Sequence, residues 1–216
     1  MEEKIKNIWH GKIKEEYEKI LIIPVLKPSP QFMVCPIGLP GSGKTAVMKS
    51  LSEKFPIIRI HADQIKILLK KYNHSIDFAF TIAGKYIKKY LEAGYSIGID
   101  GDCANPITVE KILKEKEKYG LKIIWLHVNT SEDFIIKKLS QINYTWGIYN
   151  DAQDAIKDYF FKKQLHQNLN FPFLYTFDIS KKDFPIQIEE AVKKINAYLR
   201  SHQERAEALP PPFRPF

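Results

Sequence analysis

The chain has 216 residues, 44% of them hydrophobic, which is enough for one substantial α/β core. Its formal net charge of +8 favours polyanionic ligands such as triphosphates, nucleic acids or phosphorylated small molecules, although solvated lysine-rich helices would give the same total. Because it contains no apolar run of about 18 residues, no N-terminal secretion signal and only two cysteines, we expect a cytoplasmic protein without a membrane partner or a metal cluster.

The two ends of the chain differ in composition from the middle. Residues 1–29 are predicted to form an N-terminal helix and a linker, because apolar residues recur at near-helical spacing until Pro24 and Pro28 end the pattern. Residues 201–216 are predicted to be a Pro-rich tail. The main domain is therefore expected within residues 30–200.

The most specific motif lies between residues 38 and 45 and has the pattern G-x-x-x-x-G-K-[ST]. It follows an apolar run at residues 31–37, which predicts a buried strand, and it precedes a helix-compatible stretch. Glycines allow successive backbone amides to surround a phosphate, while Lys44 would reach the β- and γ-phosphates and Thr45 would offer its hydroxyl to Mg²⁺. The alternative is a Gly-rich turn before an ordinary helix. The predicted nucleotide-binding residues are Gly38, Leu39, Pro40, Gly41, Ser42, Gly43, Lys44, Thr45 and Ala46.

Beyond this loop, strand-like apolar runs alternate with helix-length segments. Further strands are expected at residues 57–60, 96–100, 121–128 and 173–178. Longer helices are expected at residues 75–93, 107–119, 152–167 and 185–201. This alternation predicts an α/β fold of the P-loop NTPase type, with a five-stranded parallel sheet flanked by helices. Polar and aromatic residues interrupt the pattern from residue 142, and a small helical lid is expected at about residues 142–165.

Two acidic residues follow strands at the edge of the sheet where ligands bind in such folds. In the strand order 2-3-1-4-5 that is usual for kinases with such a loop, Asp100 at the end of the third strand would lie about 5 Å from the loop's strand, near Thr45 and a metal ion. Asp63, after the second strand, would lie about 10 Å away, where a second substrate would present its hydroxyl. A helix N-cap at Asp63 and a turn residue at Asp100 are the alternatives.

Several of these segments together resemble the phosphate-loop kinase group, which includes polynucleotide 5′-hydroxyl kinases, zeta toxins and chloramphenicol phosphotransferase and has an AAA-type ATP-binding domain. The matching segments are Gly38 to Thr45, Asp63-x-x-Lys66, Gly94 to Gly101 and Ser131 to Leu139, within about residues 30 to 200. The resemblance implies that Asp63 is the general base on the acceptor hydroxyl. It also implies that Lys66 contacts the acceptor or the transferring phosphate, and that cationic lid residues stabilise the moving charge.

The chain differs from this group in its basic residues at two places. The group usually has Arg where this chain has Lys66, and an R-x-x-x-R run where this chain has residues 138–142. Lysine lacks the planar fork with which arginine grips phosphate. The candidates to supply the missing charge, each also interpretable as a solvated surface lysine, are Lys138, Lys157, Lys162 and Lys163.

The resulting hypothesis is an ATP- and Mg²⁺-dependent kinase with catalytic residues Asp63, Lys44, Lys66 and Lys138, and metal ligands Thr45 and Asp100. Asp102 and Asn105 could also contact the acceptor, whereas His61 and His127 are interpreted as structural. Three functions stay open. One is a 5′-hydroxyl kinase of nucleic acid, in which Tyr144, Trp146 and Tyr149 stack on bases. The others are a kinase of a small hydroxyl compound and a nucleotide-binding or ATPase module with little or no kinase activity.

Overall fold

The computed structural model describes residues 11–144, 147–167 and 170–207, and it confirms a five-stranded parallel sheet in the order β2-β3-β1-β4-β5. The strands are β1 (Phe32–Ile37), β2 (Ile57–His61), β3 (Ser96–Asp100), β4 (Lys122–Val128) and β5 (Tyr175–Phe177). Every residue of the central strand β1 is buried. This is expected of a parallel strand that is covered on both faces, and it explains the continuous apolar run in the sequence.

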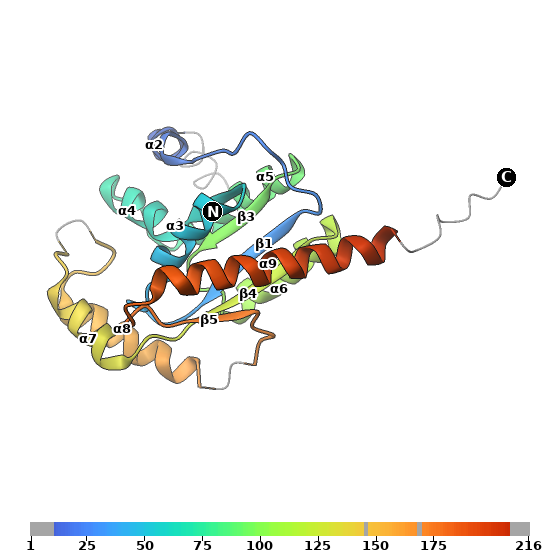
Figure 1. The fold of residues 1–216 in the computed structure, drawn as a ribbon. Helices are drawn as coiled ribbons and strands as arrows, with labels where there is room; N and C mark the ends of the chain where they lie inside the picture. The colour runs from blue at the N-terminus through green and yellow to red at the C-terminus, as the bar shows by residue number, and fades with distance from the viewer. Residues whose placement is uncertain (1–10, 145–146, 168–169, 208–216) are drawn as a thin grey trace.

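Helices cover both faces of the sheet (Figure 1). They are α2 (Lys12–Ile20), α3 (Lys44–Lys54), α4 (Ala62–Lys71), α5 (Phe78–Glu92), α6 (Pro106–Tyr119), α7 (Glu132–Gln141), α8 (Ala152–Leu165) and α9 (Phe184–Glu207). Buried side chains of α2, α4, α5 and α6 form one core with the sheet, and those of α3 and α9 form a second core on the other face. Within the described residues, no helix is both long and apolar enough to cross a membrane.

The ends of the helices follow local sequence signals. Gly94, two residues after the end of α5, and Gly120, directly after α6, adopt positive φ angles of 85° and 64°. Asn105 caps α6, because its side chain accepts hydrogen bonds from the backbone nitrogens of the first turn. The predicted contact of Asn105 with an acceptor is therefore not supported by its position, since its side-chain oxygen is already used as a cap.

The main differences from the sequence-based expectation concern α5, β5 and α9. Helix α5 begins at Phe78 rather than residue 75, because the Ser75 hydroxyl bonds to the Asp77 backbone nitrogen and carboxylate and favours a turn. Strand β5 has only three residues. Helix α9 continues to Glu207, since residues 201–207 contain neither Gly nor Pro. Residues 1–10 and the Pro-rich stretch 208–216 lie outside the described part of the chain.

The N-terminal helix α2 packs against the domain through one face, as its apolar spacing predicted. Ile13 and Tyr17 are buried in the first core, and the Tyr17 ring lies 5.0 Å from the Tyr86 ring. The Tyr17 hydroxyl also accepts a hydrogen bond of 2.9 Å from the backbone nitrogen of His61. Helix α2 is thus attached to the carboxyl end of the edge strand β2.

Helices α7 and α8 form a separate small layer beside the sheet, visible at the lower left of Figure 1. Their buried side chains are Ile135, Leu139, Ala155 and Tyr159, and Leu39 of the loop after β1 packs against this cluster. The segment expected to act as a lid therefore has its own apolar core. That core is in contact with the loop that carries the specific motif.

Candidate functional site

The loop between β1 and α3 needs glycine at several positions for steric reasons. Gly41 and Gly43 have φ angles of 77° and 103°, which side chains rarely adopt. A Cβ atom at Gly43 would lie 2.2 Å from Ile179 Cδ1, and one at Gly38 would lie 2.5 Å from the Val128 carbonyl oxygen. The backbone thus approaches its neighbours too closely for any side chain at these positions. The pattern of glycines follows from the shape of the loop.

The side chain of Thr130, which was not predicted from the sequence, stabilises this loop. The Thr130 hydroxyl is buried and donates a hydrogen bond of 2.7 Å to the Ser42 carbonyl oxygen. The Thr130 hydroxyl oxygen in turn accepts a 3.3 Å hydrogen bond from the backbone nitrogen of Ile179. Thr130 therefore links the loop to the segments that follow β4 and β5. Its position at the end of a strand was the only signal that could have indicated this role.

Lys44 lies within the curve of the loop. Its ammonium donates hydrogen bonds of 2.7 Å to the Gly38 carbonyl oxygen and 2.9 Å to the Leu39 carbonyl oxygen. Burial lowers the pKa of Lys44, although the nearby carboxylates of Asp102 and Asp63 act in the opposite direction. A desolvated ammonium held only by neutral carbonyls is stabilised further by an anion. The geometry is therefore suited to a phosphate group.

Thr45 and Asp100 lie in direct contact, as the strand order predicted. The Thr45 hydroxyl donates a hydrogen bond of 2.9 Å to Asp100 Oδ1. Asp100 Oδ2 is buried and receives no hydrogen bond from the described residues. The nitrogen atoms of two basic side chains lie near it, Arg59 Nε at 3.6 Å and His61 Nε2 at 3.7 Å.

These oxygen atoms fit a magnesium ion. Mg²⁺ prefers hard oxygen ligands and takes only one or two of them from the protein, with phosphates and waters as the others. The Thr45 hydroxyl and the buried, unsatisfied Asp100 carboxylate oxygen provide such a pair. Among the described residues, no group of three or more His, Cys, Asp or Glu side chains is placed to hold a metal ion.

Asp63 lies in the first turn of α4 and is paired with Lys66. Lys66 Nζ donates a 2.9 Å hydrogen bond to Asp63 Oδ1, and it also lies 5.4 Å from the centre of the Phe80 ring. Burial acts to raise the pKa of Asp63, but Lys66 and the more distant Lys44 hold it below its ordinary value of 3.8. The N-cap position belongs to His61, and no side chain caps this helix. The capping alternative for Asp63 is therefore wrong.

One cavity of about 350 Å³ brings most of the predicted site together. It is lined by the loop, by the first turn of α4, by the end of β3 and by the segment after α7. The predicted residues in its wall are Pro40, Gly41, Gly43, Lys44, Thr45, Ala46, Asp63, Asp100 and Lys138. Lys66 does not line it and reaches it only through Asp63. Gly38, Leu39 and Ser42 lie behind the wall.

The lid lysines have different surroundings. Lys138 Nζ lies 3.3 Å from the Gly41 carbonyl oxygen, and burial lowers its pKa. Lys162 forms an ion pair of 2.9 Å with Asp158, and Lys163 pairs closely with Glu132. Lys157 is exposed. Of the four predicted candidates, Lys138 alone lines the cavity. Lys162 is half-buried and close enough to Lys44 for its charge to lower the pKa of that residue, whereas Lys163 is exposed.

The hydroxyl groups of Tyr144 and Tyr149 form hydrogen bonds within the lid. The Tyr144 hydroxyl donates to the Leu139 carbonyl oxygen at 2.6 Å, and the Tyr149 hydroxyl donates to Asp158 at 2.6 Å. The two rings meet edge to face with their centres 6.3 Å apart. Both residues line the cavity, but their rings pack against each other and against the lid core. Trp146, the third predicted stacking residue, lies outside the described residues.

A histidine contact near the site was not predicted. His166, at the C-terminal end of α8, places Nε2 2.9 Å from Asp102 Oδ2. This pair joins the lid to the segment after β3, and Asp102 also lies close enough to Lys44 for the two charges to interact. The contact of Asp102 with an acceptor stays a prediction. His127 stacks on Phe173 with ring centres 4.6 Å apart, and burial lowers its pKa, in agreement with its interpretation as a structural residue.

The sheet order, the loop after β1 and the Thr45–Asp100 pair define a P-loop nucleoside-triphosphate-binding protein. A family model described as AAA domain matches residues 33–158, and the chain belongs to this family. No curated protein matches the sequence.

Solved structures of phosphate-loop kinases share the fold. A candidate kinase from Chloroflexus aurantiacus has a TM-score of 0.60 at 16% identity, covering 79% of this chain and 97% of its own. A gluconokinase from Sinorhizobium meliloti has a TM-score of 0.55 at 13% identity, covering 82% and 97%. The APS kinase CysC from Mycobacterium tuberculosis, in complex with AMPPNP and APS, has a TM-score of 0.51 at 14% identity, covering 78% and 99%. At these identities the likeness establishes the fold.

Proposed function

We propose that this protein is an ATP- and Mg²⁺-dependent kinase that transfers the γ-phosphate to a hydroxyl group of a small molecule. The observation that carries this proposal is a single cavity of about 350 Å³ whose wall contains the loop lysine Lys44, the Thr45–Asp100 pair and the carboxylate of Asp63. A phosphate site, a magnesium site and a proton acceptor are the parts that phosphoryl transfer requires.

The chain's own residues would divide this work as follows. Backbone amides of the loop and the Lys44 ammonium would hold the β- and γ-phosphates, while Thr45 and Asp100 would hold the metal. Bound Mg²⁺ would supply charge neutralisation on the phosphate oxygens. Lys138, in contact with the Gly41 carbonyl oxygen, would add positive charge from the lid.

Asp63 would take the proton of the acceptor hydroxyl. Its Oδ1 atom is bonded to Lys66, which fixes the orientation of the carboxylate and leaves Oδ2 to face the acceptor. The lowered pKa keeps this carboxylate ionised at neutral pH. Lys66 would therefore act mainly by orienting Asp63, a role that a lysine can fill as well as an arginine.

Several observations favour a small acceptor over a nucleic acid. The segment after α7 lines the cavity, and the hydroxyls of the two described lid tyrosines are hydrogen-bonded within the lid. Part of the chain's positive charge is also neutralised in ion pairs such as Lys162–Asp158. Among structures of the same fold, the gluconokinase and the APS kinase are small-molecule kinases by name.

A transfer screen tests this proposal. The protein is incubated with γ-³²P-ATP, Mg²⁺ and separate sets of sugars, nucleosides, aminoglycosides and 5′-hydroxyl oligonucleotides, beside an Asp63→Asn variant. We expect labelled product in a small-molecule set and none from the variant. Labelling of oligonucleotides, with affinity that falls steeply as salt is raised, would identify a nucleic-acid kinase instead.

The second candidate is a nucleotide-binding or ATPase module. It is favoured by the cavity wall, which contains no arginine among the described residues, whereas arginine is the usual stabiliser of transferring phosphate. This function predicts tight binding of ATP, slow release of inorganic phosphate and no transfer to any hydroxyl compound in the same screen. The kinase predicts faster ATP consumption when its acceptor is present.

A further inference from the structure

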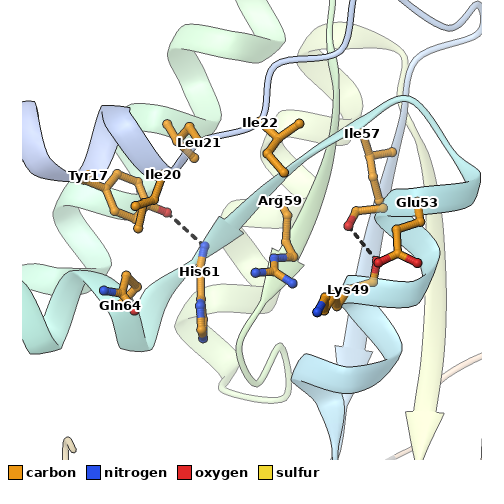
Figure 2. Close-up of a pocket in the computed structure, with 11 residues that line it drawn as sticks. Tyr17, Ile20, Leu21, Ile22, Lys49, Glu53, Ile57, Arg59, His61 and Gln64 are labelled. Atoms are coloured by element: carbon orange, nitrogen blue, oxygen red, sulfur yellow. Dashed lines mark hydrogen bonds between the residues drawn. The ribbon is translucent and has the colours of Figure 1, made fainter. Parts of the chain in front are cut away.

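A second cavity lies on the other side of His61, between α2, α3 and the edge strand β2 (Figure 2). Its volume is about 370 Å³. Of the residues that line it, His61 alone also lines the cavity with the phosphate-binding loop. The two cavities are therefore neighbours with separate walls.

Arg59 is the distinctive residue of this second cavity. It is the only arginine in the first 199 residues of the sequence, where every other cation of the Lys/Arg type is a lysine. Figure 2 shows its side chain projecting from β2 into the space between His61 and Lys49. Within the described residues, its contact is the ion pair with Asp100, in which Nε lies 3.6 Å from Oδ2 and outside ordinary hydrogen-bond distance. The guanidinium thus has donors to offer to another group.

The charge of the cavity wall favours an anion. Lys49 from α3, together with Arg59 and His61 from β2, contributes cations or potential cations from two elements, and Gln64 of α4 adds an amide. Glu53 is the acidic residue among those lining the cavity. Arginine presents a planar fork of donors that matches a phosphate group. The opposite wall is apolar and consists of Ile20, Leu21 and Ile22.

We propose that this cavity binds a small phosphorylated molecule, with its phosphate on Arg59, Lys49 and His61 and its carbon skeleton against Ile20 to Ile22. This ligand is distinct from the nucleotide and from the acceptor of the proposed kinase reaction. The site joins the N-terminal helix to β2, so the ligand would contact α2 as well as the main domain.

The test measures phosphate binding after the phosphate-binding loop has been filled. The protein is saturated with Mg²⁺ and AMPPNP, and saturation is verified by titration; inorganic phosphate and phenyl phosphate are then titrated by calorimetry. We expect one ion per chain. Phenyl phosphate should bind more tightly than inorganic phosphate because its ring would contact the apolar wall. Equal affinities would contradict that contact.

Variants assign the ion to this cavity. Arg59→Gln should weaken phosphate binding at least about tenfold, since a charge-assisted hydrogen bond is lost, and Arg59→Lys should restore only part of it. Lys54→Gln is the charge-matched control, because Lys54 lies on α3 outside the cavity and is paired with Glu189. It should bind phosphate as the unmodified protein does.

Three results would overturn the proposal: no phosphate binding to the nucleotide-loaded protein, unchanged binding by Arg59→Gln, or an equal loss in Lys54→Gln. Because Arg59 is partly buried beside Asp100, its variants could fail to fold. In that case the Lys49→Gln variant, changed at an exposed position, is the deciding test. Its affinity for phosphate should be several-fold weaker, and an unchanged affinity would contradict the site.

Discussion

The hydroxyl of Thr45 donates a 2.9 Å hydrogen bond to Asp100 Oδ1, which joins the first turn of α3 to the carboxyl end of β3. The two residues are 55 positions apart in the sequence, and the placement of β3 next to β1 brings them together. The contact leaves the second carboxylate oxygen of Asp100 without a hydrogen bond from the described residues. It thereby creates a pair of oxygen ligands beside the phosphate-binding loop.

Replacing Thr45 by valine should weaken magnesium binding while preserving the shape of the side chain. The hydroxyl is lost as a ligand and as the donor that orients Asp100, so the Mg²⁺ concentration needed for half-maximal nucleotide binding should rise about tenfold or more. Magnesium titrations at fixed nucleotide concentration measure this. Thr45→Ser keeps the hydroxyl and should behave nearly as the unmodified protein, and an equal defect in both variants would argue against the assignment.

Asp63→Asn should slow phosphoryl transfer by about 10²- to 10⁴-fold, because the amide cannot take the acceptor's proton. Nucleotide affinity should change little, since the residue is proposed to face the acceptor. Rates under saturating ATP, combined with equilibrium nucleotide binding, separate the two effects. Transfer at the unmodified rate would show that Asp63 is not the base.

The acid side of the pH profile provides an independent check on Asp63. Its pKa is lowered from 3.8, so the carboxylate is ionised at every pH above this value and loses its charge only as the pH falls through the lowered pKa. Ionisation of Asp63 should therefore impose no loss of kcat/KM between about pH 5 and pH 8. An acidic limb near pH 6 that disappears in a variant retaining residual activity, such as Asp63→Glu, would contradict this.

Gly43→Ala should disrupt the loop. The new methyl group would lie 2.2 Å from Ile179 Cδ1 at a φ of 103°, and the strained backbone alone costs about 1–3 kcal/mol. We expect lower stability in denaturant unfolding and loss of nucleotide binding. Gly84→Ala is the matched control: it lies inside helix α5 with open space around the added atom, and it should stabilise the protein by up to about 1 kcal/mol.

His166→Ala should loosen the lid. Removing the imidazole leaves the partly buried Asp102 carboxylate without its 2.9 Å contact, at a cost of about 1–3 kcal/mol. Faster amide hydrogen exchange should appear in α8 before it appears in the sheet. The neighbouring exposed residue Gln167 provides the control, since Gln167→Ala should leave exchange in α8 unchanged. Equal protection in both variants would show that the contact does not hold the lid.

Local patterns were sufficient to predict the fold and the centre of the site. The glycine spacing, the apolar run before it and the alternation of strands with helices predicted a parallel sheet with a phosphate-binding loop. The strand order itself came from the resemblance to phosphate-loop kinases. The contact between Thr45 and Asp100 followed from that order. These inferences depend on backbone geometry, which the sequence constrains strongly.

Side-chain contacts between distant segments could not be predicted in the same way. The bond from Thr130 to the loop, the pairing of His166 with Asp102 and the position of Arg59 beside Asp100 each join elements whose relative orientation depends on packing. Similarly, the lid lysines of α8 were equivalent in the sequence, and only the fold distinguishes them from Lys138.

The most direct test of the phosphate-transfer site is the transfer rate of a Lys44→Ala variant, measured with γ-³²P-ATP and the acceptor found in the screen. Removal of the one ammonium inside the loop should lower the rate by at least about 100-fold, because a charge that stabilises the transferring phosphate is lost. Circular dichroism should show an intact fold. Transfer at the unmodified rate by a folded Lys44→Ala protein would contradict the proposed site.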